Sequence, residues 1–500
     1  MILTMPHRIP HWIHNARVEK HTETSAVYNP AEGVVIAEVG FATTECVADA
    51  VLSAAQAFTT WSCMPPLKRA RILNQFTQLL MQHQDQIAEC ITHEHGKVFA
   101  DAQGEVQRGI ELVEYYCGIP HLLRGEQSCE VANGMDCHTI RQPLGVCVGI
   151  SPFNFPVMIP IWLMIPAIAC GNTFVLKPSE KDPSATLLCM ELLKEAGLPA
   201  GVANMIHGGR DVVSQLIAHP AVKAVNAVGS TPVVKQIYAE AIAAGKRSQT
   251  FGGAKNHAIV MPDAPIDAVA DALVGAAFGA AGERCMALPV AVVVGDTTAD
   301  QLIVALQTRV SQLRVGSGMD AVDMGPLIRR EHCDRVSRLI ESGIQAGARL
   351  VCDGRSHVKS LNPNGFFLGP CVFDHVAPDM DIYQEEIFGP VLCILRVPTF
   401  DAAILQVNSH HYGNGAAIFT NSGGVARRFE REVEAGMVGI NVAIPVPVVS
   451  HSFGGWKQSW FGDVHMHGME GIHFYTRAKS ITSRWLNDQT GSAFHMPTHG

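Results

Sequence analysis

Cys285 lies in a segment rich in small residues, GAAFGAAGERCMA, which extends from Gly275 to Ala287. Glycine and alanine leave room for a thiol to lie against a flat ring, and thiolate chemistry needs an accessible, electropositive site of the kind that Arg284 helps to create. A buried, unreactive cysteine is the plain alternative. The composition of this segment therefore makes Cys285 the candidate nucleophile.

Two short motifs are candidates for nucleotide binding, although the chain lacks a G-x-G-x-x-G fingerprint. LKPSE follows a predicted strand, so Lys177 and Glu180 can hydrogen-bond ribose hydroxyls, and the carboxylate of Glu180 would repel a 2′-phosphate, which favours NAD over NADP. VGST stands where a strand turns into a helix, so free amides and Ser230 can hold a pyrophosphate. A surface ion pair and an ordinary helix cap remain the alternatives for these motifs.

Two arginines are candidates for binding an acid group on the substrate. Arg284 precedes the candidate nucleophile, and Arg108 lies in the EVQRGIE segment. An arginine fork binds a carboxylate through two parallel hydrogen bonds, so a pair of forks near the thiol would select an acidic aldehyde. Salt bridges to Glu105 or Glu283 are the alternative.

The composition excludes several classes of protein. A chain of 500 residues with 47% hydrophobic content can form more than one core, and its net charge of −9 argues against nucleic acid or an anionic membrane as partner. The longest apolar stretch, residues 156–170, contains three prolines and is too short to span a bilayer. The dispersed cysteines favour a reducing cytoplasm, and we expect His465, His467 and His473 to form a solvated face rather than a metal site.

Periodicity predicts an α/β fold with a doubly wound sheet. Short apolar strands alternate with helices from Gly145 onward, a second α/β pattern begins near His257, and Thr44 to Cys117 is helical. Asn133-Gly134 is typical of a hairpin turn. We expect a dinucleotide-binding domain (residues 1–123 and 144–253), a catalytic domain (254–455), a small β oligomerisation unit (124–143 and 456–486) and a disordered tail (487–500).

The chain resembles the aldehyde dehydrogenase superfamily from about Tyr28 to Trp485. Five motifs stand in the order typical of that superfamily: ISPFNFP from Ile150, LKPSE, VGST, GERCM and EEIFGP from Glu385. Four segments are similar in sequence to the coenzyme A-acylating methylmalonate-semialdehyde dehydrogenase branch: PLGVCVGISPFNFP, GAKNHAIVMPDA, GAAGERCMA and FGGWKQSWFGD. Ala227, Pro289 and the segment from Val448 to Gly455 depart from the expected pattern.

This resemblance implies a set of residue roles. Cys285 would be the nucleophile, Asn154 the side-chain donor to the oxyanion, and Arg108 and Arg284 the ligands of the substrate carboxylate. It implies NAD as cofactor, a homodimer or homotetramer built through the Asn133-Gly134 hairpin and a strand near Phe474 to Thr482, and methylmalonate or malonate semialdehyde as substrate. The residues implied to line the NAD site are Ser151, Phe153, Lys177, Glu180, Lys181, Ser230, Gly252 and Glu386.

One absence bears on the second half of the reaction. Hydrolytic members of the superfamily have a glutamate four residues before the lysine of their E-L-G-G-K motif, where it activates water as a general base. In the TFGGAK segment of this chain that position is Phe251. We therefore predict acyl transfer to coenzyme A, giving propionyl- or acetyl-coenzyme A, NADH and carbon dioxide. A hydrolytic semialdehyde dehydrogenase is the nearest alternative, and a non-catalytic NAD-binding protein is the alternative from another class.

Overall fold

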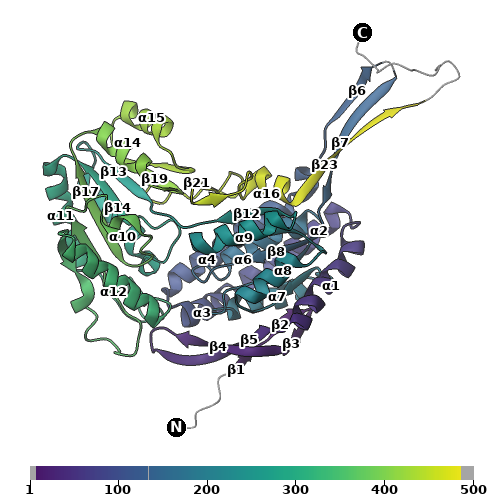
Figure 1. The fold of residues 1–500 in the computed structure, drawn as a ribbon, viewed down its shortest axis with the longest axis horizontal. Helices are drawn as coiled ribbons and strands as arrows, with labels where there is room; N and C mark the ends of the chain where they lie inside the picture. Colours follow the sequence, from purple (N-terminus) through teal and green to yellow (C-terminus); the bar gives the residue numbers. More distant parts are fainter. Residues whose placement is uncertain (1–6, 133, 486–500) are drawn as a thin grey trace.

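The computed structural model describes residues 7–132 and 134–485. Figure 1 shows two α/β units side by side, with the earlier part of the chain in one and residues from about 257 to about 457 in the other. The chain then returns to the first unit and enters a narrow β arm that projects away from both. The tail predicted to be disordered, residues 487–500, lies outside the described residues. The predicted α/β class is confirmed.

The first unit is built on a mostly parallel sheet. Its central strands are β8 (Val146–Ile150), β9 (Thr173–Lys177), β10 (Ala203–Met205), β11 (Val222–Val228) and β12 (Arg247–Phe251). With the edge strands β2 (His11–Ile13), β3 (Ala16–Val18) and β22 (Trp460–Phe461), the order is β22-β12-β11-β8-β9-β10-β2-β3. The chain order reverses between β8 and β11, where a doubly wound sheet forms its ligand crevice at the carboxyl ends of the strands.

Helices cover both faces of this sheet. The side chains of β8 alternate, so Val146 and Val148 pack on one face while Cys147 packs on the other. The first face meets α1 (Thr44–Trp61), α8 (Arg210–Ala218) and α9 (Thr231–Ala243). The second meets α6 (Met158–Ala169) and α7 (Ser184–Glu195), on which α2 (Pro66–Gln82), α3 (Gln84–His95) and α4 (Phe99–Cys117) pack in turn. The helical region predicted from Thr44 to Cys117 is thus confirmed as four helices, and the short α5 (Ile119–Leu122) follows.

The apolar stretch between residues 156 and 170 forms α6, in which all twelve residues are buried. A helix that is apolar on every side is stable only where protein surrounds it completely. The prediction of a buried helix is confirmed. Among the described residues, no helix is long and apolar enough to cross a membrane.

The second unit is built on a separate sheet in the order β15-β16-β17-β14-β13-β19-β20. All neighbours in it are parallel except β15 and β16. The strands are β13 (His257–Val260), β14 (Val290–Val294), β15 (Arg349–Asp353), β16 (Cys371–Asp374), β17 (Val391–Val397), β19 (Gly415–Phe419) and β20 (Met437–Ile440). The helices are α10 (Ile266–Phe278), α11 (Asp296–Val310), α12 (Arg330–Gln345), α13 (Asp381–Gln384), α14 (Phe400–Ser409) and α15 (Gly423–Glu432), and the pair β18 (Tyr412–Gly413) and β21 (Trp456–Lys457) lies beside the sheet.

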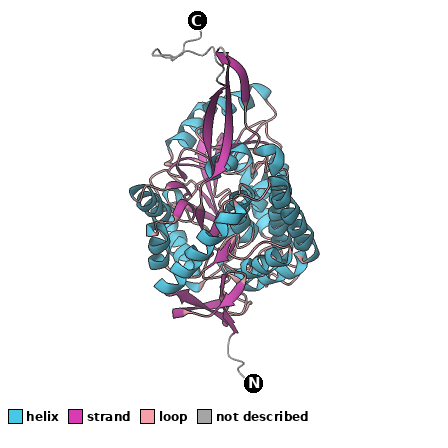
Figure 2. Ribbon diagram, turned by 90° about the vertical axis from the view of Figure 1, so that its right-hand side faces the viewer, coloured by secondary structure: helices cyan, strands magenta, loops and turns pink. Residues whose placement is uncertain are grey.

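The projecting arm is a three-stranded antiparallel sheet in the order β23-β7-β6 (Figure 2). β6 (Gln127–Ala132) and β7 (Met135–Pro143) pair as predicted for a hairpin, although Asn133 lies outside the described residues. The predicted third strand is confirmed as β23 (Thr476–Arg484), but Phe474 belongs to the preceding helix α16 (Gly468–Tyr475). An additional sheet, β1 (His7–Ile9), β5 (Val34–Ala42) and β4 (His21–Asn29), was not predicted.

Candidate functional site

The candidate residues meet where the two units face each other. Asn154 follows β8, Ser230 follows β11 and Gly252 follows β12, so all three lie at the carboxyl edge of the first sheet. Cys285 precedes β14 and Glu386 precedes β17, so both lie at the amino edge of the second sheet. The site therefore combines opposite edges of two sheets.

The turn before Cys285 has an unusual backbone. Within the 3₁₀ turn η1 (Gly279–Gly282), Ala280, Ala281 and Gly282 have φ values of 49°, 52° and 75°. A Cβ on Gly282 would stand 2.3 Å from the carbonyl oxygen of Gly389, so the turn requires glycine there. Left-handed conformations at the two alanines cost about 1 kcal/mol each, a strain that packing around the turn must offset.

Two asparagine side chains hold the peptide that follows the nucleophile. Asn256 Nδ2 donates to the carbonyl oxygens of Cys285 at 3.0 Å and Ala287 at 2.8 Å. Asn414 Nδ2 also donates to the Cys285 carbonyl, at 3.2 Å. Both asparagines stand at the amino edge of the second sheet, immediately before β13 and near β19. They were missed because nothing local in the sequence links them to position 285.

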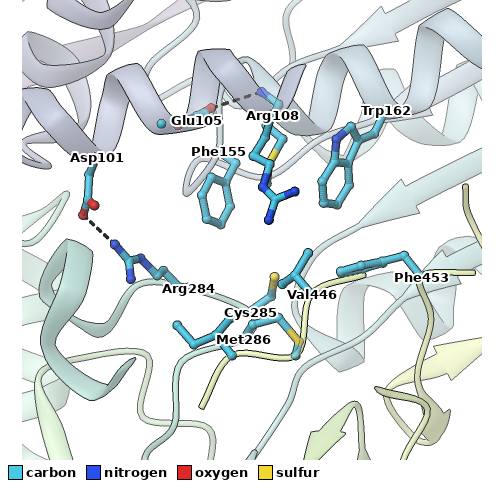
Figure 3. A pocket seen from close by; sticks show the side chains of 13 residues that line it. Asp101, Glu105, Arg108, Phe155, Trp162, Arg284, Cys285, Met286, Val446 and Phe453 are labelled. Carbon is cyan, nitrogen blue, oxygen red and sulfur yellow. Dashed lines mark hydrogen bonds and ion pairs between the residues drawn. The ribbon is translucent and has the colours of Figure 1, made fainter. Parts of the chain in front are cut away.

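Cys285 lies at the junction of two cavities. The larger has a volume of about 360 Å³. The smaller has a volume of about 210 Å³ and also contains Phe153, Asn154, Ser230, Gly252 and Glu386 in its wall. Figure 3 shows the larger cavity, with Cys285 on one wall and Phe155, Arg108 and Trp162 facing it. A thiol in this position can contact one ligand in each cavity.

The charges around Cys285 keep its resting thiol protonated. Burial raises the pKa of Cys285 to about 12, the carboxylate of Glu386 adds to this, and Arg284 opposes it only weakly. Burial also raises the pKa of Glu386 to about 7, partly opposed by the amide of Ala254, which donates to Oε1 at 2.8 Å. Ionisation of the thiol therefore depends on what binds in the two cavities.

A buried ion pair positions Asn154. Lys97 Nζ lies 2.7 Å from Glu105 Oε2 and donates to the backbone carbonyl of Asn154 at 2.7 Å. Glu105 Oε1 accepts from the amides of Val157 at 2.8 Å and Met158 at 3.1 Å, at the start of α6. A buried pair with all these partners is costly to break, because either charge alone would be unpaired. Asn154 is therefore held rigidly in the wall of the smaller cavity.

The smaller cavity has the features of a dinucleotide site. Glycines at 229, 252 and 253 let a ligand approach the backbone, and a Cβ on Gly253 would stand 2.5 Å from Glu386 Oε2. α9 begins beside this cavity, and its N-cap residue Ser230 makes no side-chain capping bond, so amides of the first turn can meet a phosphate. Ser151 lies beneath the cavity rather than in its wall: it is 3% exposed, and its amide donates to the carbonyl of Lys177.

The other predicted cofactor residues lie in an adjoining region. Lys177 Nζ and Glu180 Oε2 are 3.1 Å apart. Glu180 and Lys181 line a further cavity, which shares His332 with the smaller cavity beside Cys285. The ammonium of Lys181 lies 4.4 Å from the centroid of the Phe153 ring. The structure thus brings these residues next to the predicted dinucleotide site without placing them in one cavity.

Both candidate arginines line the larger cavity, but neither forms the salt bridge considered from the sequence. Arg284 pairs with Asp101 at 2.6 Å (Figure 3), and Arg108 pairs with Glu111 at 3.1 Å. The latter pair is substantially exposed, with the two side chains 41% and 39% accessible, so it is worth little and can exchange for another carboxylate.

The C-terminal histidines do not form the solvated face that we expected. His467 is 1% exposed and packs edge-on against Trp162 at a centroid distance of 4.5 Å. Trp162 and Phe453 line the larger cavity, so His467 supports its aromatic wall. Nowhere in residues 7–132 and 134–485 do three or more His, Cys, Asp or Glu side chains gather as a possible metal site.

Phe251 occupies the position of the missing base. It ends β12, is 5% exposed, and packs edge-on against Trp460 at 4.0 Å. A second ring, that of Phe453, lies 6.2 Å away. The position is filled by an aromatic cluster rather than by a carboxylate.

Comparison with known proteins agrees with this arrangement. The family model described as "Aldehyde dehydrogenase family" matches residues 17–481. A malonate-semialdehyde dehydrogenase from Pseudomonas aeruginosa is 51% identical, with 95% of this chain and 96% of the relative aligned. A structure of a methylmalonate-semialdehyde dehydrogenase from Oceanimonas doudoroffii superposes with a TM-score of 0.95 at 51% identity, over 96% of this chain and 99% of that one.

A second structure, from Sinorhizobium meliloti, was solved with NAD and is provisionally assigned as a methylmalonate-semialdehyde dehydrogenase. It superposes with a TM-score of 0.96 at 48% identity, over 97% of this chain and 99% of that one. Similarity of this extent covers both sheets, the nucleophile turn and the arm. The chain belongs to the aldehyde dehydrogenase family.

Proposed function

We propose that this protein oxidises malonate semialdehyde or methylmalonate semialdehyde with NAD and transfers the acyl group to coenzyme A. The observation that supports this most strongly is the position of Cys285, between a cavity lined by two arginines and a cavity suited to a dinucleotide. The names of the aligned relatives point to the same substrates. The products are acetyl- or propionyl-coenzyme A, NADH and carbon dioxide.

The first half-reaction uses residues of both units. The Cys285 thiolate adds to the aldehyde carbon, and the alkoxide that forms accepts hydrogen bonds from the Asn154 side chain and the Cys285 amide. NAD, when bound, accepts the hydride that leaves this carbon. Phe153, Ser230, Gly252 and Glu386 would hold NAD in the smaller cavity, with Lys177, Glu180 and Lys181 toward its adenosine end, and Ser151 supports this wall from beneath. The result is a thioester on Cys285.

The acid group of the proposed substrate gives a role to the two arginines that line the larger cavity. A carboxylate bound by Arg108 or Arg284 lies in the larger cavity with the thiol, so the aldehyde is oriented before attack. Once the thioester has formed, the carboxylate is β to a carbonyl, so the C–C bond can break to release carbon dioxide and leave an enolate. The enolate then takes a proton at carbon and gives the acetyl or propionyl thioester. Loss of the charged group also ends its attraction to the arginines, which favours the next step.

Replacing Arg108 by leucine should raise the KM for malonate semialdehyde by about 10- to 100-fold, as expected for loss of a charge-assisted bidentate contact. The KM for propanal, which has no carboxylate, should change by less than about twofold, since only the lost fork distinguishes the two substrates. Steady-state NADH formation with both aldehydes measures the difference. Arg71→Leu, on the exposed surface of α2, is the matched control and should leave both KM values unchanged. Equal effects of R108L on the two aldehydes would contradict the assignment.

Product analysis tests the proposed reaction as a whole. Mass spectrometry of a reaction with NAD, coenzyme A and methylmalonate semialdehyde should detect propionyl-coenzyme A, with one carbon dioxide released per NADH. Free acid as the main product would instead indicate the hydrolytic alternative. A non-catalytic protein would form no NADH with any aldehyde of a broad panel. These assays therefore separate all three possibilities.

We also propose that the chain assembles as a homodimer or homotetramer through its arm. β6 and β23 are edge strands of a sheet that projects from the rest of the molecule, and exposed edges favour pairing with another chain. We also propose the domain boundaries expected from the sequence, with one correction: β22 and α16, which lie within residues 456–486, pack on the first unit rather than belonging to the arm. The fourteen cysteines are all unpaired, which is consistent with a cytoplasmic location.

A further inference from the structure

A buried carboxyl group lies two residues before the candidate nucleophile. Glu283 is 0% exposed. Its Oε1 accepts from the amide of Ile328 at 3.3 Å and lies 3.6 Å from His332 Nε2. Its Oε2 lies 3.9 Å from His95 Nε2, and neither of these two atoms has a hydrogen-bond partner in the described part of the chain. The group is neither a surface charge nor one half of a tight ion pair.

The hydrogen bonds of the two imidazoles fix which nitrogen bears the proton. His95 Nδ1 accepts from the amide of Lys97 at 3.3 Å, so in the neutral ring the proton is on Nε2. His332 Nε2 donates to the carbonyl of Phe388 at 2.6 Å, so its proton is also on Nε2. The unpartnered N–H of His95 therefore faces Glu283 Oε2 at a separation longer than a hydrogen bond, whereas the N–H of His332 is taken up by the Phe388 carbonyl.

These side chains close a ring around the floor of the smaller cavity. His95 stacks on Phe153 at 6.0 Å, Phe153 meets Phe388 edge-on at 5.9 Å, and Phe388 lies 6.4 Å from His332. Glu283 completes the ring between the two histidines. Phe153, Phe388 and His332 line the same cavity as Cys285. The carboxyl thus joins the turn of the nucleophile to the wall of the dinucleotide site.

We infer that Glu283 is a positioning residue for Cys285: its carboxyl holds the nucleophile's turn against His95 and His332, and its proton keeps negative charge away from the developing thiolate. This rests on the proposed role of Cys285 as nucleophile. Glu283 has no part in the proposed steps of aldehyde oxidation, and this inference gives the buried acid a role.

The charges that face Glu283 support a protonated resting form. Burial raises its pKa to about 8, opposed by the Ile328 amide and by Lys181 and Lys97. Burial lowers the pKa of His332 to about 4 and that of His95 well below its usual value, so both imidazoles are uncharged at neutral pH. As pH rises through about 8, Glu283 becomes an anion two residues before Cys285. It adds to the carboxylate of Glu386, whose pKa burial raises to about 7, and both are opposed by Arg284. A negative charge there disfavours the thiolate.

Alkylation of Cys285 by iodoacetamide tests this inference without substrate or coenzyme A. The rate at this one cysteine is followed by peptide mass spectrometry in the full chain between about pH 6.5 and pH 9.5, the range in which a buried acid of this kind titrates. Glu283→Gln copies the protonated acid in shape and charge. Glu331→Gln, an exposed carboxyl on α12 beside His332, removes the same charge from the surface and is the matched control.

We expect E283Q to match the wild type within about twofold near neutral pH and to react roughly three- to tenfold faster at the alkaline end, because only the wild type then holds a nearby buried anion. E331Q should follow the wild type throughout. Glu386 ionises in both proteins, so the difference between their profiles isolates Glu283. The wild-type profile should bend twice, once for each carboxyl, which can be measured even if E283Q fails to fold. Superimposable profiles for wild type and E283Q, or a wild-type profile with only one bend below the ionisation of the thiol, would overturn the inference. Absence of NADH formation from malonate semialdehyde in the wild type, measured separately, would instead count against the proposed function.

Discussion

Replacing Cys285 by alanine should reduce NADH formation from a semialdehyde by at least about 10⁴-fold, since removal of a covalent nucleophile leaves no route to the thioester. The thiol is the group of the nucleophile's turn that lines both cavities, and the turn is held in place by Asn256 and Asn414. The alanine variant keeps the backbone and these hydrogen bonds. The loss should therefore appear in kcat rather than in folding.

The measurement is steady-state NADH absorbance with saturating aldehyde, NAD and coenzyme A. NAD binding, followed by quenching of tryptophan fluorescence, should remain within about threefold of the wild type, because the dinucleotide cavity loses only one sulfur atom. Cys63→Ala, at an exposed cysteine, controls for the loss of a thiol as such and should be fully active. Activity of C285A above about 1% of the wild type would mean that another residue forms the covalent bond.

Omitting coenzyme A should stop the reaction after one turnover. The thioester on Cys285 needs a nucleophile, and water needs a general base to act at a useful rate. At the position where hydrolytic members have that base, Phe251 packs against Trp460. Without a base, hydrolysis should be at least about 100-fold slower than transfer to coenzyme A, whose thiol is the better nucleophile.

The other carboxylates in the wall of the larger cavity are already engaged. Asp101 pairs with Arg284, and Glu105 is bound to Lys97 and to the amides at the start of α6. Neither is free to activate water. Glu386 lies on the side of the smaller cavity, where we propose that it contacts NAD.

Rapid mixing with NAD and malonate semialdehyde should give a burst of about one NADH per active site, and steady turnover should follow only when coenzyme A is added. The control for active-site concentration is the same experiment with coenzyme A present from the start. Its burst should merge into steady turnover. If turnover without coenzyme A continues at the full rate, the protein is a hydrolytic semialdehyde dehydrogenase and a different residue must serve as base.

Local patterns were enough to predict the class of fold and the order of its parts. After Gly145, the spacing of apolar residues shows which positions are buried. Buried positions repeat with the period of the local backbone, so this spacing predicts where strands and helices alternate. The apolar residues 156–170 read as a buried helix for the same reason, and α6 is one. The sheet of β1, β5 and β4 was missed because its edge strands β1 and β4 are largely exposed and give little periodic signal.

Motifs located the chemistry because each is a continuous segment whose backbone shape is set by its own residues. The nucleophile's turn needs small residues and a glycine at 282, and these are visible in the sequence. The hairpin from β6 to β7 is visible in the same way. A solvated face at His467 was the wrong prediction, since the ring of Trp162, against which it packs, is far away in the chain.

Tertiary structure alone decided which distant groups meet. The carboxyl edge of the first sheet faces the amino edge of the second. This brings Asn154 and Cys285 to one cavity although they are far apart in the chain. It also decided that Arg284 pairs with Asp101, that Lys97 holds Asn154, and that Glu283 lies between two histidines. Periodicity records whether a side chain is buried, whereas its partner depends on how whole elements pack, and that packing is a property of the complete chain.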